Sequence, residues 1–164
     1  MKGRTMALLG MLCISPLCVS PLAGAVDLVR VEKSARKLFL LQQGKVVREF
    51  NMVLGSNPVG HKQQEGDGKT PEGVYWLDFK KPDSAYYKSI HVSYPNAQDL
   101  AAARKLGVSA GGQIMLHGQP NGLGLMSALT QQRDWTAGCI ALSNADMEVV
   151  WQAVRVPMRI EILP

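Results

Sequence analysis

A chain of 164 residues with 46% hydrophobic and 19% charged residues is ordinary for a globular protein with one domain and one core. Its formal charge of +5 falls to +3 without Lys2 and Arg4, with 16 basic against 13 acidic residues. This charge is too small, and the basic residues are too dispersed, for a nucleic-acid-binding surface, so nucleic acid is not expected as a partner. The sequence shows no internal repeat, no low-complexity tract and no second domain.

The first 25 residues have the pattern of a cleavable export signal. Lys2 and Arg4 precede an apolar stretch over residues 6–19, and Ala23 and Ala25 are small residues suited to cleavage after position 25. An uncleaved membrane anchor is the alternative, but the stretch is shorter than the ~20 residues that a membrane span needs. We therefore expect a signal peptide over 1–25, a domain over 26–164 located in the periplasm, and no transmembrane span after cleavage.

Cleavage would leave a single cysteine in the mature chain. Cys13 and Cys18 would be removed with the signal, and Cys139 would remain. An odd thiol in an oxidising compartment is a liability unless it pairs between chains or is used chemically. The alternative is an inert buried thiol, since a free cysteine is often part of a core.

The rest of the chain reads as short strands separated by turns. Alternating and β-rich runs predict strands at residues 28–32, 37–42, 45–54, 74–78, 90–94, 114–116 and 159–163. Gln43-Gly44 predicts a hairpin turn, and the Gly- and Pro-rich residues 55–73 predict a surface loop.

Two helices are indicated between these strands. The first spans residues 99–106, with Asn96 or Asp99 near its start and Gly107 just after its end. The second begins at Ser143 or Asn144, is ended by Pro157, and buries a stripe formed by Met147, Val150, Trp151 and Val154. The pattern predicts a mainly β fold, a sandwich or small barrel with two or three short helices, rather than alternating βαβ units.

His117 and Cys139 are the residues most suited to covalent chemistry. A neighbouring imidazolium would stabilise a cysteine thiolate and could return a proton to a leaving amine. Gly138 permits a tight turn, so the amides of Gly138 and Cys139 could face one point as an oxyanion hole, with a hydroxyl from Thr136 and a flat wall from Trp135. The alternative is a tight turn with no role in catalysis.

Four motifs, in order, resemble the YkuD-type L,D-transpeptidase catalytic domain of bacterial cell-wall enzymes. They are GDGKTPEG at 66–73, HVSYPN at 91–96 followed by Asp99, IMLHG at 114–118, and TAGCIAL at 136–142. The resemblance implies the sandwich- or barrel-like fold of that family, Cys139 as nucleophile and His117 as its base. It also places Thr136 and Gly138 in the motif that shapes the anion site, and it implies no metal or organic cofactor.

The resemblance also implies a reaction on peptidoglycan stem peptides. The Cys139 thiolate would attack the carbonyl of the third stem residue, commonly a diamino acid, and expel the terminal D-alanine. An acceptor amine would then take the acyl group, which makes a crosslink or attaches a wall-bound protein. Water as the acceptor would make the reaction a hydrolysis.

Two positions depart from the family pattern. Ala137 stands where the family usually has a second histidine, and Ala141 stands where it usually has arginine. The Trp-Thr-x-Gly-Cys form resembles a branch that includes hydrolases, and it leaves Arg133 or Lys69 to hold a substrate carboxylate. We expect transpeptidation, with hydrolysis and a non-catalytic wall-binding module as the alternatives.

The remaining candidates concern substrate contacts and metal binding. Gly118, Trp135 and His91 are candidate substrate-binding residues, although for His91 a satisfied core histidine is the favoured alternative. His61 is expected to be a solvated surface residue. A zinc site built from these histidines and the cysteine is not expected, because the short ligand spacing of such sites is missing.

Overall fold

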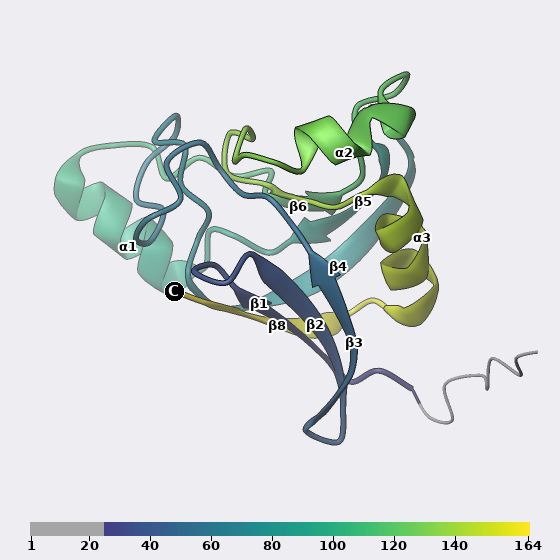
Figure 1. The fold of residues 1–164 in the computed structure, drawn as a ribbon. Coiled ribbons are helices and arrows are strands. Elements are labelled where there is room, and N and C mark those ends of the chain that lie inside the picture. Colours follow the sequence, from purple (N-terminus) through teal and green to yellow (C-terminus); the bar gives the residue numbers. More distant parts are fainter. Residues whose placement is uncertain (1–24) are drawn as a thin grey trace, which may run out of the picture.

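The computed structural model describes residues 25–164, so the expected signal peptide, apart from Ala25, lies outside the described residues. These residues form one eight-stranded sheet in the order β3-β2-β1-β8-β4-β5-β6-β7 (Figure 1). The strands are β1 (Leu28–Glu32), β2 (Lys37–Gln42), β3 (Lys45–Asn51), β4 (Gly73–Ser84), β5 (Tyr87–Val92), β6 (Met115–His117), β7 (Ile140–Ala141) and β8 (Met158–Leu163). The helices are α1 (Ala97–Leu106), α2 (Ser127–Thr130), α3 (Asn144–Ala153) and the 3₁₀ turn η1 (Gly124–Met126).

The sheet curls so that the chain just after one edge strand, β3, reaches the other edge strand, β7. Val53, just after β3, forms an antiparallel bridge with Ala141 of β7, through two backbone hydrogen bonds of 3.0 and 2.9 Å. Because the chain leaves β2 to reach the opposite edge, β3 ends at Asn51 and not at the expected residue 54. The curled sheet is a half-barrel, which confirms the mainly β, barrel-like fold expected from the sequence.

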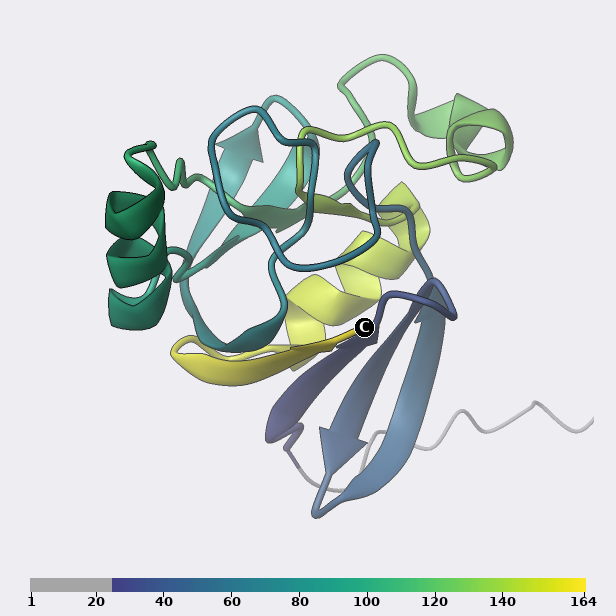
Figure 2. The ribbon, with the colours of Figure 1, turned by 90° about the vertical axis from the view of Figure 1, so that its left-hand side faces the viewer.

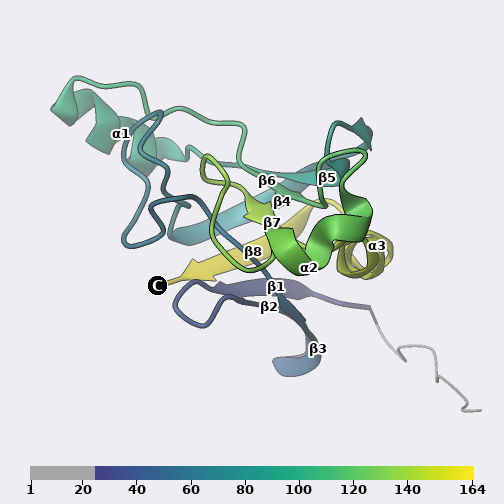
Figure 3. The same ribbon diagram turned by 45° about the horizontal axis from the view of Figure 1, so that its top comes forward.

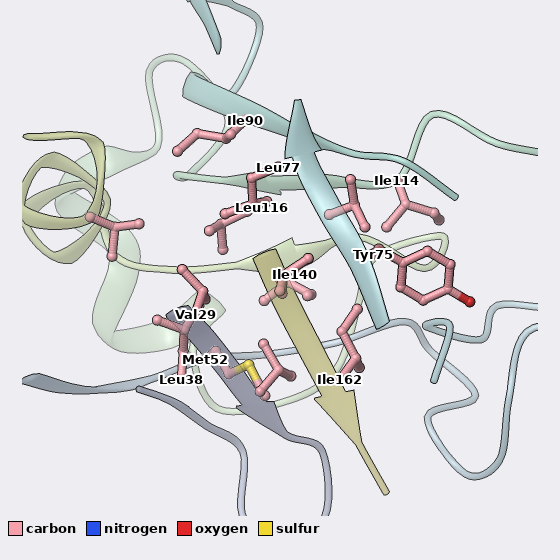
Figure 4. Packing of buried hydrophobic residues seen from close by; sticks show 14 of the residues in the cluster. Val29, Leu38, Met52, Tyr75, Leu77, Ile90, Ile114, Leu116, Ile140 and Ile162 are labelled. Atoms are coloured by element: carbon pink, nitrogen blue, oxygen red, sulfur yellow. The ribbon is translucent and has the colours of Figure 1, made fainter. Parts of the chain in front are cut away.

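The strand β8 holds the two halves of the sheet together. It pairs in parallel with β1 and antiparallel with β4, so Ile160 lies between Val29 and Tyr75. Figure 4 shows core side chains of β1, β2 and β8 facing those of β5, β6 and β7 across one interior, including Val29, Leu116 and Ile140, all fully buried. One continuous core therefore supports both the outer hairpin and the strands that carry the candidate site.

The hairpin of β4 and β5 is longer than the sequence indicates. Strands were expected at 74–78 and 90–94, whereas β4 runs to Ser84 and β5 begins at Tyr87. Pro82 and the neighbouring charged residues argue against a regular strand there, since proline cannot donate to a strand ladder. The structure accommodates Pro82 where the pairing register shifts, between Lys81 and Ser84.

The helices lie at the ends and in the interior of the curled sheet. Asn96 caps α1 through a capping box with Asp99, and Gly107 ends it in the left-handed conformation. Figure 2 shows α3 between the two halves of the sheet, where Met147 and Val150 are fully buried as the apolar stripe predicts. The sequence did not locate α2, which lies beside the turn into β7 (Figure 3). No helix among residues 25–164 has the length and apolar character to cross a bilayer.

The loop of residues 55–73, called here the 55–73 loop, is rigidly held. Lys33, 2% exposed, donates to the carbonyls of Gly60 and Thr70 and to Glu72 Oε1, at 2.7, 3.0 and 2.7 Å. His61 accepts from the Glu72 amide and its Nε2 lies 3.1 Å from Asp99 Oδ1, so this expected surface histidine is partly exposed and is held by two protein partners. Its ring connects this loop to helix α1.

Candidate active site

The pairing of β6 with β7 places the expected histidine and cysteine on one face. Leu116 pairs with Ile140 and His117 with Ala141, in parallel register. Side chains alternate along a strand, so Leu116 and Ile140 face the core while His117 and Cys139 face the other side. Both line a pocket of about 430 Å³, to which Trp135 and Thr136 also contribute.

His117 is fixed in one tautomer by its neighbour. Its Nδ1 lies 2.6 Å from the carbonyl oxygen of Gly118, which can only accept, so Nδ1 carries the proton and Nε2 is the free acceptor. The ring is 3% exposed and lies against Tyr86 at 4.6 Å and Trp135 at 6.0 Å, measured between ring centroids. Burial lowers the pKa of His117, and the bond to Gly118 opposes this only in part, so the neutral base is favoured.

The thiol of Cys139 is partly buried beside two backbone groups. Its Sγ donates to the carbonyl of Gln113 at 3.7 Å and accepts from the amide of Met115 at 3.4 Å. Burial raises the pKa of the Cys139 thiol, while the Met115 amide and the positive charge of Lys62 oppose part of the rise. The free site therefore favours a neutral thiol beside a neutral imidazole, which differs from the thiolate–imidazolium pair expected from the sequence.

The turn before Cys139 depends on Gly138 and Thr136, but not in the expected way. The Gly138 amide donates to Thr136 Oγ1 at 3.1 Å, and Oγ1 donates to the Cys139 carbonyl at 2.7 Å. These bonds are made within the turn, so neither the Gly138 amide nor the Thr136 hydroxyl is free for an oxyanion. Gly138 has φ +129°, and a Cβ there would lie 2.6 Å from the Lys69 carbonyl oxygen. Both residues therefore shape the turn.

Two other candidates, Gly118 and His91, do not line the pocket of Cys139. Gly118 is buried, and its carbonyl orients His117. His91 pairs with Asp78 at 2.8 Å and stacks on Phe79 at 4.6 Å between ring centroids, and it does not line the pocket of Cys139. Of the expected substrate contacts, the structure brings only Trp135 to this pocket.

Sequence reasoning missed Tyr86 and Gln113. Tyr86 reaches the His117 ring because the tip of the β4–β5 hairpin folds back, and the amide of Gly118 donates to its carbonyl at 3.1 Å. Gln113 has φ +56°, an uncommon conformation for a residue with a side chain, and this conformation accompanies the approach of its carbonyl to Cys139. No sequence pattern signals either residue, since both depend on long-range folding.

The described residues offer no ready metal site. Among residues 25–164, no group of three or more His, Cys, Asp or Glu side chains is arranged to hold a metal ion. The arrangement of a cysteine, a neutral histidine and nearby aromatic walls suits nucleophilic attack on a carbonyl.

Comparison with known proteins gives a consistent family assignment. The model of the YkuD family, the L,D-transpeptidase catalytic domain, matches residues 27–162. The candidate L,D-transpeptidase YafK of Escherichia coli (strain K12) is 30% identical over 139 residues, which cover 81% of this chain and 49% of YafK. The chain therefore spans about half the length of the curated relatives it matches.

Two solved structures have the same fold. The helical cell shape determining protein Pgp2 of Campylobacter jejuni is 30% identical, with a TM-score of 0.62 over 85% of this chain and 48% of its own. Bd1075 of Bdellovibrio bacteriovorus is 24% identical, with a TM-score of 0.60 over 86% of this chain and 49% of its own.

Proposed function

The chain belongs to the YkuD family of L,D-transpeptidase catalytic domains, and we propose that it transfers acyl groups of peptidoglycan stem peptides through Cys139. The observation that carries this proposal is the placement of Cys139 and His117 on the same face of paired strands, in one pocket, with Nε2 of His117 unprotonated. Pgp2 determines helical cell shape, and this supports a role for the present chain in cell-wall modification. Export by the signal peptide to the periplasm would bring it to that substrate.

The proposed reaction begins with the neutral pair. His117 Nε2 takes the proton of the Cys139 thiol as Sγ attacks the stem-peptide carbonyl, and the amide of Cys139 faces the oxygen that becomes negative. The imidazolium then gives the proton to the departing amine, which leaves an acyl-enzyme on Cys139. An acceptor amine attacks the thioester, His117 removes its proton, and the thiol is regenerated.

Trapping of the acyl-enzyme tests this proposal. Mature wild type and Cys139→Ser are mixed with a carbapenem or with a disaccharide-tetrapeptide, and the intact protein mass is measured. A covalent adduct of the expected mass on wild type, absent from Cys139→Ser, is the expected result. No adduct with either reagent, together with unchanged peptide, would favour the non-catalytic wall-binding module.

Hydrolysis is the second candidate, because of Ala137. This exposed alanine lines the pocket of Cys139 at the position where the family usually has histidine, so a small methyl group borders the acyl-enzyme. A smaller side chain leaves room for water. Product analysis separates the two activities: a crosslinked dimer indicates transpeptidation, whereas free tripeptide without dimer, in the presence of excess acceptor, indicates hydrolysis.

A further inference from the structure

We propose that Lys62 binds a carboxylate of the peptide substrate in a second pocket beside Cys139. This inference rests on the proposed function and adds to it the residue that recognises the substrate's charge. The second pocket has a volume of about 510 Å³ and is lined by Lys62, Glu65 and backbone of the glycines at 66 and 111, among others.

The second pocket continues directly from the pocket of Cys139. Gln113 and Ala137 line both, and the Gln113 carbonyl accepts from Cys139 Sγ at 3.7 Å. Ala137 is exposed and ends at Cβ, so no long side chain of that residue separates the two spaces. A peptide bound at Cys139 can therefore extend a neighbouring group toward Lys62.

Lys62 is a buried ammonium with one donor to spare. Its side chain is 3% exposed, and Nζ donates to the Gln64 carbonyl at 3.0 Å and to Asp67 Oδ1 at 2.8 Å. Lysine carries three N–H donors, so these two acceptors from the described residues leave one donor for a ligand. Lys33 differs, because its three acceptors use all three donors.

The surroundings hold the Lys62 ammonium in place. Burial alone would raise the pKa of Asp67, but the bond from Lys62 and three backbone amides lower it to about 2, so this carboxylate stays charged. Asp67 therefore fixes Lys62 without needing its third donor. A carboxylate is the matching ligand, since a charge-assisted hydrogen bond is stronger than a neutral one.

Glu65 limits which groups can enter. It accepts a hydrogen bond from Ser109 Oγ at 3.1 Å and is exposed in the same pocket. Its negative charge opposes any anionic group near the opening. A carboxylate therefore binds here through its hydrogen bond to the third donor of Lys62, and a second anionic group on the ligand would meet repulsion without that compensation.

The two residues considered from the sequence for this role are placed elsewhere. Arg133 is exposed and lines a separate pocket with Ser34 and Arg36. Lys69 lines neither the pocket of Cys139 nor the pocket of Lys62. Because Arg133 is a cation outside both pockets, it provides a matched control for Lys62.

The test combines charge changes on the protein and on the substrate. A stem tetrapeptide and its derivatives, each with one carboxyl group converted to the amide, are assayed for kcat/KM with wild type, Lys62→Met and Arg133→Met. We expect one amidation to lower the wild-type kcat/KM roughly 10- to 100-fold, the range of a lost charge-assisted hydrogen bond. Lys62→Met should lower kcat/KM for the free acid by a similar factor. It should leave kcat/KM unchanged for the peptide whose amidation impairs wild type, whereas Arg133→Met should behave as wild type with every peptide.

Two results would overturn the inference while leaving the proposed function intact. One is an equal loss for every peptide in Lys62→Met, which would indicate a structural role or an effect on the thiol. The other is a wild-type kcat/KM that no amidation of the peptide changes. No turnover and no acyl-enzyme with any peptide in wild type would instead overturn the proposed function, and the inference with it.

A second variant guards against misfolding of Lys62→Met. Ala137→Glu places a carboxylate at an exposed position on the wall shared by the two pockets. The new charge would compete for Lys62 and repel the substrate's carboxylate, so kcat/KM should fall more for the free acid than for the selected amide. An equal fall for both would count against carboxylate binding at Lys62.

Discussion

At the scale of single residues, burial favours the uncharged forms of both candidate catalytic groups. It raises the pKa of Cys139 and lowers the pKa of His117, so each is shifted toward neutrality in the free protein. A neutral imidazole with its proton held on Nδ1 is prepared to accept the thiol proton at Nε2 when a substrate arrives. An exposed thiolate–imidazolium pair would be more reactive toward oxidants, so neutrality also protects the only cysteine in the described part of the chain.

The lowered pKa of His117 predicts how stability depends on pH. Below about pH 6.5 the histidine of the unfolded chain takes up a proton, whereas the folded chain resists this until its lower pKa is reached. The unfolding free energy contributed by His117 should therefore fall with decreasing pH, by at most about 1.4 kcal/mol per pH unit. A thiolate–imidazolium pair would raise the folded pKa and give the opposite sign.

Urea unfolding at pH 7.5 and 5.5 checks this dependence. His117→Gln should lose less stability than wild type between the two pH values, while Arg133→Met, which changes an exposed residue outside the pocket of Cys139, should lose as much as wild type. The same pH dependence in His117→Gln as in wild type would contradict a neutral buried His117.

At the scale of elements, the sequence predicted the strand bounds and helix caps that depend only on neighbouring residues. The bounds of β1 and β2, the capping of α1 by Asn96 and its end at Gly107 all follow from nearby residues, and the structure confirms them. The end of β3 and the extent of β4 could not be predicted in this way, because each depends on a partner strand far away in the sequence.

The residues of the candidate site also differ in whether the local sequence could predict them. Cys139 and His117 are predicted from residue type and motif, and the register places both on one face. The hydrogen bonds that Thr136 and Gly138 make within the turn were not predicted, since a sequence does not show which partners a hydroxyl or an amide will find. Lys62 lies in a loop that sequence patterns describe only as turns, so its burial became visible only in the folded chain.

The packing of the 55–73 loop against the turn before Cys139 predicts the effect of Gly138→Ala. The new methyl group would lie 2.6 Å from the backbone oxygen of Lys69, and φ +129° is strained for any residue with a side chain. The backbone conformation alone costs about 1–3 kcal/mol, and relief of the clash must move either the loop or Cys139. We expect lower stability and a fall in kcat/KM of at least about 10²-fold, because small displacements of a nucleophile are costly.

A substitution at a second glycine, Gly44, distinguishes the effect of the steric clash from that of backbone strain. Gly44 in the β2–β3 hairpin also has a positive φ, +74°, but a Cβ there meets no atom within 4 Å. Gly44→Ala should therefore show a smaller loss of stability and keep wild-type kcat/KM, when both variants are measured by urea unfolding and peptide turnover. Equal behaviour of the two variants would show that the contact with Lys69 is unimportant.

At the scale of the whole molecule, the last strand joins the two halves of the sheet. β8 lies between β1, the first strand, and β4, and it contributes Ile160 and Ile162 to the common core. The β1–β3 hairpin region and the strands carrying Cys139 are joined through it and through the bridge from Val53 to Ala141. Pairing between the two ends of the described chain is non-local, which explains why sequence patterns gave the strands but not their order.

Ile160→Ala should therefore destabilise both halves together. Ile160 is fully buried, and its truncation leaves a cavity between β1 and β4, for which a loss of about 2–5 kcal/mol is expected. Val74→Ala on the adjacent strand is the control, because Val74 is 51% exposed and its loss should stay within about 0.5 kcal/mol. Urea unfolding of Ile160→Ala is followed by tryptophan fluorescence and by far-ultraviolet circular dichroism. The unfolding transitions seen by the two probes should be shifted from those of wild type by the same amount. Transitions that separate would mean that the hairpin and the site-bearing strands unfold independently, and that β8 does not couple them.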